Sequence, residues 1–123
     1  MVTGLSGSGS QDWHQDSANV NGSAEKDDHF GWSLAAGDYD GDGIDDLAIG
    51  SPREDVSGSD DAGYVNVLFG TSSGLTGSSD QSFSQDSTGM PGSSEVDDNL
   101  GYALAAGDFN GDGKTDLLTT ANN

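Results

Sequence analysis

The chain has 123 residues, of which 31% are hydrophobic and 20 are glycine, and its formal net charge is −19. Because such a surface repels nucleic acid and anionic membranes, we expect neither nucleic-acid binding nor membrane insertion. Cysteine is absent, which excludes disulfides, thiol catalysis and thiolate metal sites.

A duplication organises the chain. Shifted by 70 residues, the sequence aligns with itself without a gap, and 24 of the 50 pairs from Gly4/Gly74 to Arg53/Asn123 are identical. The identities extend well beyond one loop, so the sequence predicts a duplicated structural unit.

In chain order, residues 1–30 are expected to hold a strand, the counterpart of the one near 81–85, followed by a linker. One complete unit is expected over 31–86, and residues 87–123 are expected to hold a linker and two further strands. The connections are rich in Gly, Ser and Asp, and no stretch has a sustained 3.6-residue apolar period, so almost no helix is expected. The strands of the complete unit are expected at 31–37, 46–50, 64–69 and about 81–85.

Four strands per repeat, with small residues such as Gly31, Ala35 and Ala36 in the first, are typical of β-propeller blades, whose inner strand is crowded. The sequence therefore predicts an all-β chain of about 1.75 blades, with seven antiparallel strands. A β-sandwich or a loose meander with the same strands is the alternative. Since 1.75 blades cannot close a ring, the neighbouring blades are expected from the same parent chain or from other copies.

Two nine-residue acidic runs, 38–46 and 108–116, stand at equivalent places in the units. Each has oxygen-bearing side chains at positions 1, 3, 5 and 9 and glycine at positions 4 and 6. Ca²⁺ takes six to eight oxygen ligands in flexible geometry, so the spacing predicts two calcium sites. The expected ligands are Asp38, Asp40, Asp42, Asp46 and the carbonyl of Ile44 in the first run, and Asp108, Asn110, Asp112, Asp116 and the carbonyl of Lys114 in the second.

Other interpretations of these runs compete with calcium binding. An EF-hand is disfavoured because Ile49 or Thr119 stands where its bidentate Glu is needed. Asp/Gly turns without metal remain an alternative, and Mg²⁺ is a weaker candidate because it resists dehydration. The first site has four carboxylates; the second has three, with the cation Lys114 close by. We therefore expect the first site to bind more tightly.

The string FGWSLAAGD at 30–38, the acidic run after it and LAIGSP at 47–52 resemble the FG-GAP repeat of integrin α-subunit propellers and of many bacterial extracellular proteins. The resemblance implies blades of a propeller, commonly seven-bladed, with calcium held in the hairpin between the first two strands. The second unit departs from the pattern: Leu100 replaces the Phe, and residues 119–123 give a weaker second strand.

For function, the resemblance implies a non-enzymatic, extracellular module for adhesion or ligand binding, with a protein partner. A glycan-binding lectin, using Trp13 and Trp32 as exposed aromatics, and an accessory domain of a secreted hydrolase or lyase are alternatives. No Gly-x-Ser-x-Gly elbow or phosphate-binding glycine loop occurs, so no catalytic residues are predicted. Residues 1–10 lack the pattern of a signal peptide, so none is expected in this chain.

Overall fold

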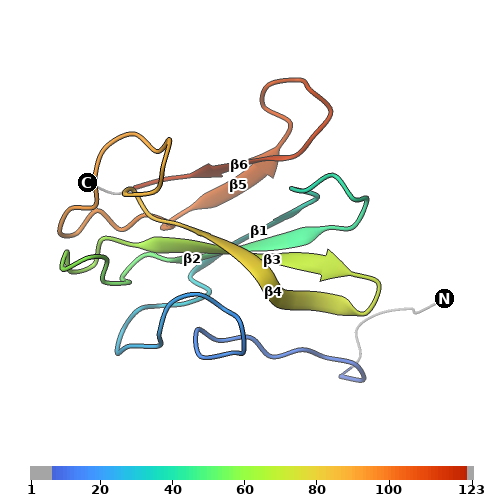
Figure 1. Ribbon diagram of the computed structural model, residues 1–123, viewed down its shortest axis with the longest axis horizontal. Coiled ribbons are helices and arrows are strands. Elements are labelled where there is room, and N and C mark those ends of the chain that lie inside the picture. Colours follow the sequence, from blue (N-terminus) through green and yellow to red (C-terminus); the bar gives the residue numbers. More distant parts are fainter. Residues whose placement is uncertain (1–6, 122–123) are drawn as a thin grey trace.

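The computed structural model describes residues 7–121 and is all-β across that range. It contains no helix there, and hence none long and apolar enough to cross a membrane. The strands form one antiparallel sheet in the order β1-β2-β3-β4 and a second of β5 and β6 (Figure 1). Their bounds are β1 Ser33–Gly37, β2 Asp46–Ser51, β3 Tyr64–Thr71, β4 Gly74–Phe83, β5 Leu104–Gly107 and β6 Asp116–Thr119.

The four-stranded sheet is a complete blade, and the two-stranded sheet repeats its first half. Leu34 pairs with Ile49 between β1 and β2, and Leu104 pairs with Thr119, their counterparts 70 residues on. The register is therefore identical in the two units. This is the arrangement of a partial β-propeller, as the 70-residue period predicts.

The linkers that precede β1 and β5 also have the same fold. Asp28 and Asp98 are buried, and their carboxylates accept the backbone N–H groups of Glu25 and Glu95. Each of these acids therefore closes the turn that leads into a blade, and the repeated Asp pairs of the sequence belong to turns.

Apolar side chains pack on both faces of the four-stranded sheet because neighbouring residues in a strand point to opposite sides. Ala48 lies in the cluster between the blade and β5–β6, whereas Ile49 lies in the cluster beneath the N-terminal segment. Figure 1 shows that segment, in blue, on the side of the sheet away from β5 and β6. The buried members are Ala48, Val65, Val67 and Leu100 in the first cluster and Val20, Ile49 and Leu68 in the second.

Glycine allows the two units to approach closely. A Cβ on Gly50 would overlap the carbonyl oxygen of Gly101, and one on Gly63 would overlap the backbone of Leu100. The Leu100 N–H donates to the carbonyl of Ala62 at 2.9 Å. The contact between the units therefore involves backbone as well as apolar side chains.

Six strands form rather than seven, since the strand expected within 1–30 is absent over residues 7–30. In this segment the side-chain amide of Gln11 donates to the Leu75 carbonyl at 2.8 Å and accepts the Leu75 N–H at 2.7 Å. A single side chain thus pairs with both backbone groups of Leu75 in β4.

The fourth strand of the blade starts earlier than expected, at Gly74 rather than near Gln81. It leaves β3 through a tight hairpin in which Thr71 pairs with Gly74, and the register shifts between Val67 and Phe69. The Gly/Ser/Asp composition of 70–80 had indicated a connection, but pairing with the strongly β-forming β3 makes a strand of the part from Gly74 onward.

Candidate metal centre

The first acidic run is the hairpin between β1 and β2. Asp38, Asp40 and Asp42 bring one carboxylate oxygen each to within 4.8 Å of one another. Gly41 and Gly43 have φ angles of 80° and 90°, a conformation that other residues adopt only with strain. The glycines therefore allow the turn that directs alternate side chains to one centre, as their spacing predicts.

Backbone N–H groups hold Asp38 in place. Its carboxylate accepts Gly41 N at 2.7 Å, Asp42 N at 3.0 Å and Gly43 N at 2.8 Å. These bonds, that from Gly43 first, lower the pKa of Asp38 and keep it ionised. The pKa of Asp40 is raised, by desolvation first and then by the charges of neighbouring carboxylates. A cation would relieve that repulsion, so the donor set fits a hard divalent ion.

Asp46 is placed differently from the other three acids. It is 1% exposed, and its two carboxylate oxygens accept Tyr39 N and Gly70 N, both at 2.8 Å. A carboxylate has about four acceptor positions, so two remain for another partner. Asp46 thus lies outside the Asp38–Asp40–Asp42 group and links the hairpin to the end of β3. Ile44, whose carbonyl is the remaining expected ligand, is 37% exposed.

The second acidic run, between β5 and β6, repeats this hydrogen bonding. Asp108 accepts Gly111 N, Asp112 N and Gly113 N, at 2.8, 3.0 and 2.8 Å. The Lys114 N–H donates to Asp112 Oδ1 at 2.9 Å, and the Asn110 amide lies 3.4 Å from Asp112 Oδ2. Asp116 accepts Phe109 N at 3.0 Å, as Asp46 accepts Tyr39 N. The second hairpin therefore has the same hydrogen bonding, with one carboxylate fewer among the expected ligands.

Both hairpins project from the same end of the molecule, at the right of Figure 1. The FG-GAP repeat matches residues 30–68 and 100–123, which include both hairpins and the strands that flank them. The chain belongs to the FG-GAP repeat family.

The relatives of this FG-GAP chain include cell-surface receptors and enzymes. Chicken (Gallus gallus) integrin alpha-8 is 35% identical over 95 residues, which are 77% of this chain and 8% of the relative. Integrin alpha-PS2 of Drosophila melanogaster is 31% identical over 105 residues, 85% of this chain and 6% of the relative. Bovine (Bos taurus) phosphatidylinositol-glycan-specific phospholipase D is 36% identical over 90 residues, 72% and 10% of the two chains. The chain thus spans about a tenth or less of each of these proteins.

The first strands of the two FG-GAP units, β1 and β5, have aromatic side chains at the ends away from the acidic hairpins. Trp32 and Tyr102, which are counterparts, are 52% and 45% exposed, and their rings lie 5.6 Å apart. His29 stacks on Trp32 at 5.3 Å. Trp13, expected to be exposed, is partly buried against the core cluster beneath the N-terminal segment, so that expectation was wrong. The exposed aromatic surface is therefore formed by Trp32 and Tyr102.

A buried acid in the first FG-GAP unit was not recognised from the sequence. Glu54 is 7% exposed and accepts a hydrogen bond from Gln15 Nε2 at 2.5 Å. Burial, partly offset by that bond and reinforced by the charges of Asp28 and Glu25, raises its pKa to about 7. Two neighbours of Glu54 are repeated in the second unit, Gln15 as Gln85 and Asp28 as Asp98, and this repetition was a signal that their surroundings are buried. Glu54 itself has no counterpart among the 50 aligned pairs, so the repeat did not mark it.

Proposed function

We propose that this chain is a calcium-stabilised, non-catalytic segment of an FG-GAP propeller that serves adhesion or ligand binding outside the cell. The observation that carries the proposal is the group of Asp38, Asp40 and Asp42, whose carboxylate oxygens lie within 4.8 Å of one another. In this proposal Asp46 and the carbonyl of Ile44 complete the first site. Asp108, Asn110, Asp112, Asp116 and the carbonyl of Lys114 form the second site.

Calcium in these hairpins would act on stability rather than on chemistry. The hairpin joins the first two strands of a blade, and Asp46 also contacts Gly70 at the end of β3. An ion that neutralises the crowded carboxylates would reduce their repulsion in the hairpin that Asp46 links to β3. Because the ion would bind the folded blade and not the unfolded chain, it would also stabilise the fold by mass action. The similarity to integrin alpha chains supports a protein ligand and an extracellular location.

Thermal unfolding with and without Ca²⁺ tests the metal proposal. At a Ca²⁺ concentration ten times the dissociation constant, each site adds about 1.4 kcal/mol of stability. Asp42→Ala is expected to lose part of this gain, whereas Asp45→Ala, which removes an exposed carboxylate outside the ligand spacing, is expected to keep it. Equal melting temperatures of the unsubstituted chain in Ca²⁺ and in EDTA would reject calcium binding.

Glycan binding is a second candidate, favoured by the exposed rings of Trp32 and Tyr102. Aromatic faces in this setting can stack on the apolar faces of sugars. A glycan array probed with the unsubstituted chain and with the Trp32→Ala variant separates this function from protein binding. Binding of a glycan that survives Trp32→Ala would contradict a role for the aromatic surface.

An accessory role beside a catalytic domain is the third candidate, and the similarity to phosphatidylinositol-glycan-specific phospholipase D favours it. It requires a catalytic domain elsewhere in a parent protein. The full parent sequence tests it, because a parent composed only of adhesion modules would contradict it.

A further inference from the structure

The second acidic hairpin contains an asparagine directly followed by a glycine. Asn110 stands at position 3 of the run, where the first hairpin has Asp40, and Gly111 follows it as Gly41 follows Asp40. Asparagine is a thermolabile residue. Its side-chain amide is lost fastest before glycine, which has no side chain to shield its backbone nitrogen from the amide carbon. The hairpin therefore carries a group that can be modified without an enzyme.

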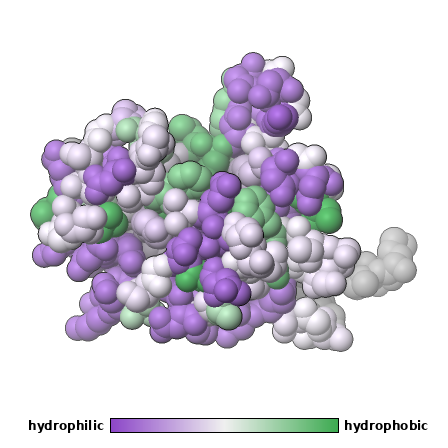
Figure 2. Space-filling model, in the orientation of Figure 1, coloured by the Kyte–Doolittle hydropathy of each residue, from purple (hydrophilic) through white to green (hydrophobic). Residues whose placement is uncertain are grey.

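The tip of this hairpin is open to solvent. All residues of 108–114 are exposed, and Figure 2 shows mostly hydrophilic colour where the hairpin projects at the upper right. The corresponding tip of the first hairpin, 40–44, is exposed as well, although Thr115 of the second unit lies against Gly37 at its base. Exposure is thus a property of the hairpin tip itself, and water reaches the amide of Asn110.

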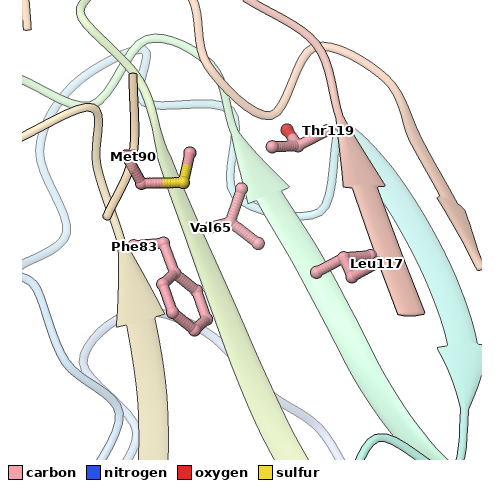
Figure 3. Close-up of a pocket in the computed structure, with 5 residues that line it drawn as sticks. All are labelled: Val65, Phe83, Met90, Leu117 and Thr119. Carbon is pink, nitrogen blue, oxygen red and sulfur yellow. The ribbon is translucent and has the colours of Figure 1, made fainter. Parts of the chain in front are cut away.

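The base of the second hairpin, in contrast, is held in place. Leu117 of β6 packs against the core cluster between the two units. Figure 3 shows Leu117 and Thr119 on one side of Val65, and Phe83 and Met90 on the other, around an apolar pocket. Because the strand after the hairpin is fixed by these contacts, the tip can rearrange without unfolding of β6.

In the closed hairpin both groups that must react are held by hydrogen bonds. The Gly111 N–H donates to Asp108 Oδ1 at 2.8 Å, and Asn110 Oδ1 accepts the Asp112 N–H at 3.0 Å. Both bonds have to be released before the Gly111 nitrogen can approach the amide carbon of Asn110. A cation bound by the side chains of Asp108, Asn110 and Asp112 would keep the hairpin closed. The reaction therefore belongs to the hairpin without an ion.

The reaction needs no reagent besides water. The Gly111 nitrogen loses its proton to solvent base and bonds to Cγ of Asn110, while the bond from Cγ to Nδ2 breaks and Nδ2 leaves as ammonia after taking a proton from water. Water then opens the five-membered imide that has formed. Opening at Cγ gives aspartate with the original backbone, and opening at the backbone carbonyl gives isoaspartate, in which the chain continues through the side chain.

An aspartate at position 110 fits the hydrogen bonding of the hairpin. In the first hairpin Asp40 accepts the Asp42 N–H at 3.1 Å, the same bond that Asn110 makes with Asp112. The converted second hairpin would have the four carboxylates of the first. Isoaspartate adds a carbon to the backbone between the oxygens that have to converge, so it would not fit in the same way.

We infer that Asn110-Gly111 is a self-modification site, at which loss of the side-chain amide supplies the carboxylate that the first hairpin already has at Asp40. The consequence for metal binding rests on the proposed function. The freshly made chain has the weaker second site, and conversion to aspartate brings that site to the carboxylate number of the first. A bound ion protects Asn110, so the conversion proceeds while calcium is scarce.

Incubation of the full chain at mildly alkaline pH, in Ca²⁺ or in EDTA, tests the inference. Peptide mapping by mass spectrometry follows the conversion and separates aspartate from isoaspartate. In EDTA, Asn110 is expected to convert faster than Asn19, an exposed asparagine followed by valine. At a Ca²⁺ concentration about ten times the dissociation constant, about a tenth of the sites stay empty, so the rate at Asn110 should fall about tenfold.

The chain offers an internal control for the effect of the ion, since Asn21-Gly22 is its other Asn-Gly pair. Asn21 lies against β3 and β4, where its N–H donates to Asp80 and its carbonyl accepts the Asn66 side-chain amide. Its rate should be the same in Ca²⁺ and in EDTA. The Asn110→Gln variant is the chemical control: it keeps an uncharged amide but would need a six-membered ring, so no conversion is expected there.

The Asn110→Asp variant reproduces the product of the reaction. In the Asp42→Ala background, which weakens the first site, calorimetry should find the second site tightened by about tenfold, because affinity follows the number of charged ligands. An unchanged affinity would overturn the consequence for metal binding.

The remaining outcomes separate the modification from the calcium proposal. Conversion at Asn110 no faster than at Asn19 would overturn the inference, whether or not calcium binds. Equal rates in Ca²⁺ and in EDTA, together with an unchanged melting temperature, would reject the calcium sites and still support the modification. Equal rates although Ca²⁺ raises the melting temperature would overturn the protection of Asn110 by the ion.

Discussion

Asp46 and Gly70 are 24 residues apart and share a buried hydrogen bond, in which the Gly70 N–H donates to Asp46 Oδ1 at 2.8 Å. The last acid of the first hairpin is thereby fixed to the end of β3. The same carboxylate accepts the N–H of Tyr39 at the start of the hairpin. One side chain therefore couples the acidic loop to the third strand of the blade.

Asp46→Asn is expected to destabilise the fold by about 1–3 kcal/mol, because the amide nitrogen must face one of two buried N–H groups and leave it without an acceptor. Asp116→Asn is the matched control, since Asp116 is partly exposed and accepts a single N–H, from Phe109. Urea denaturation in EDTA measures both changes without metal effects. Equal losses in the two variants would show that the link to Gly70 contributes nothing.

The two hairpins are expected to differ in calcium affinity. Asp112→Ala leaves the site with four carboxylates, and Asp42→Ala leaves the site with three and the nearby Lys114. Calorimetry should therefore find the tighter remaining site in Asp112→Ala, with both dissociation constants in the range of about 10⁻⁴–10⁻³ M. The reverse order would mean that charge count does not set the affinity here.

Glu54 is expected to make the fold less stable as the pH rises. Its pKa of about 7 in the folded chain lies above the ordinary value of 4.5, so the folded state binds the proton more tightly than the unfolded state does. Stability is then complete below about pH 4.5 and is lost as the pH rises through 7. Glu54→Gln should remove this slope and stabilise the fold at pH 8 by up to about 3 kcal/mol, given about 1.4 kcal/mol for each pH unit between 4.5 and 7.

Denaturation curves between pH 4 and 8 test this expectation. Glu95→Gln removes an exposed Glu of the second unit and is expected to leave the slope unchanged. A Glu54→Gln chain with the parental pH dependence would place the titrating group elsewhere.

Gly50→Ala is expected to weaken the contact between the units, because the new methyl group would overlap the Gly101 carbonyl. Overpacking of this kind costs about 1–3 kcal/mol. Gly7→Ala is the control, since a Cβ at Gly7 meets nothing within 4 Å. Hydrogen exchange should show the greatest loss of protection in β5 and β6, and uniform loss across β1–β4 would point to damage within the blade instead.

The features that were predictable from the sequence are those set by local pattern. The first three strands of the blade and the turn glycines, Gly41 and Gly43, were expected from alternation and spacing, and the structure has them. The repeat predicted the same strand register in both units, and the structure has it: Leu34 pairs with Ile49, and Leu104 pairs with Thr119.

What the sequence could not supply depends on partners distant in the chain. Gln81 lies in β4, yet its counterpart Gln11 lies in no strand, because only the segment beside β3 has a ladder to join. Identical residues thus adopt different structures in different surroundings. The burial of Trp13 and the raised pKa of Glu54 have the same origin, since both follow from packing between the N-terminal segment and the blade.

The strand β1 has Trp32 immediately before it and Asp38 immediately after it. Five residues of strand span about 16 Å. The Debye length in physiological salt is only about 8 Å, so the charge state of the carboxylates is largely screened at the aromatic end. A molecule bound at Trp32 would therefore be affected by ion binding at the acidic end mainly through the backbone of β1, and little through the electric field of the carboxylates.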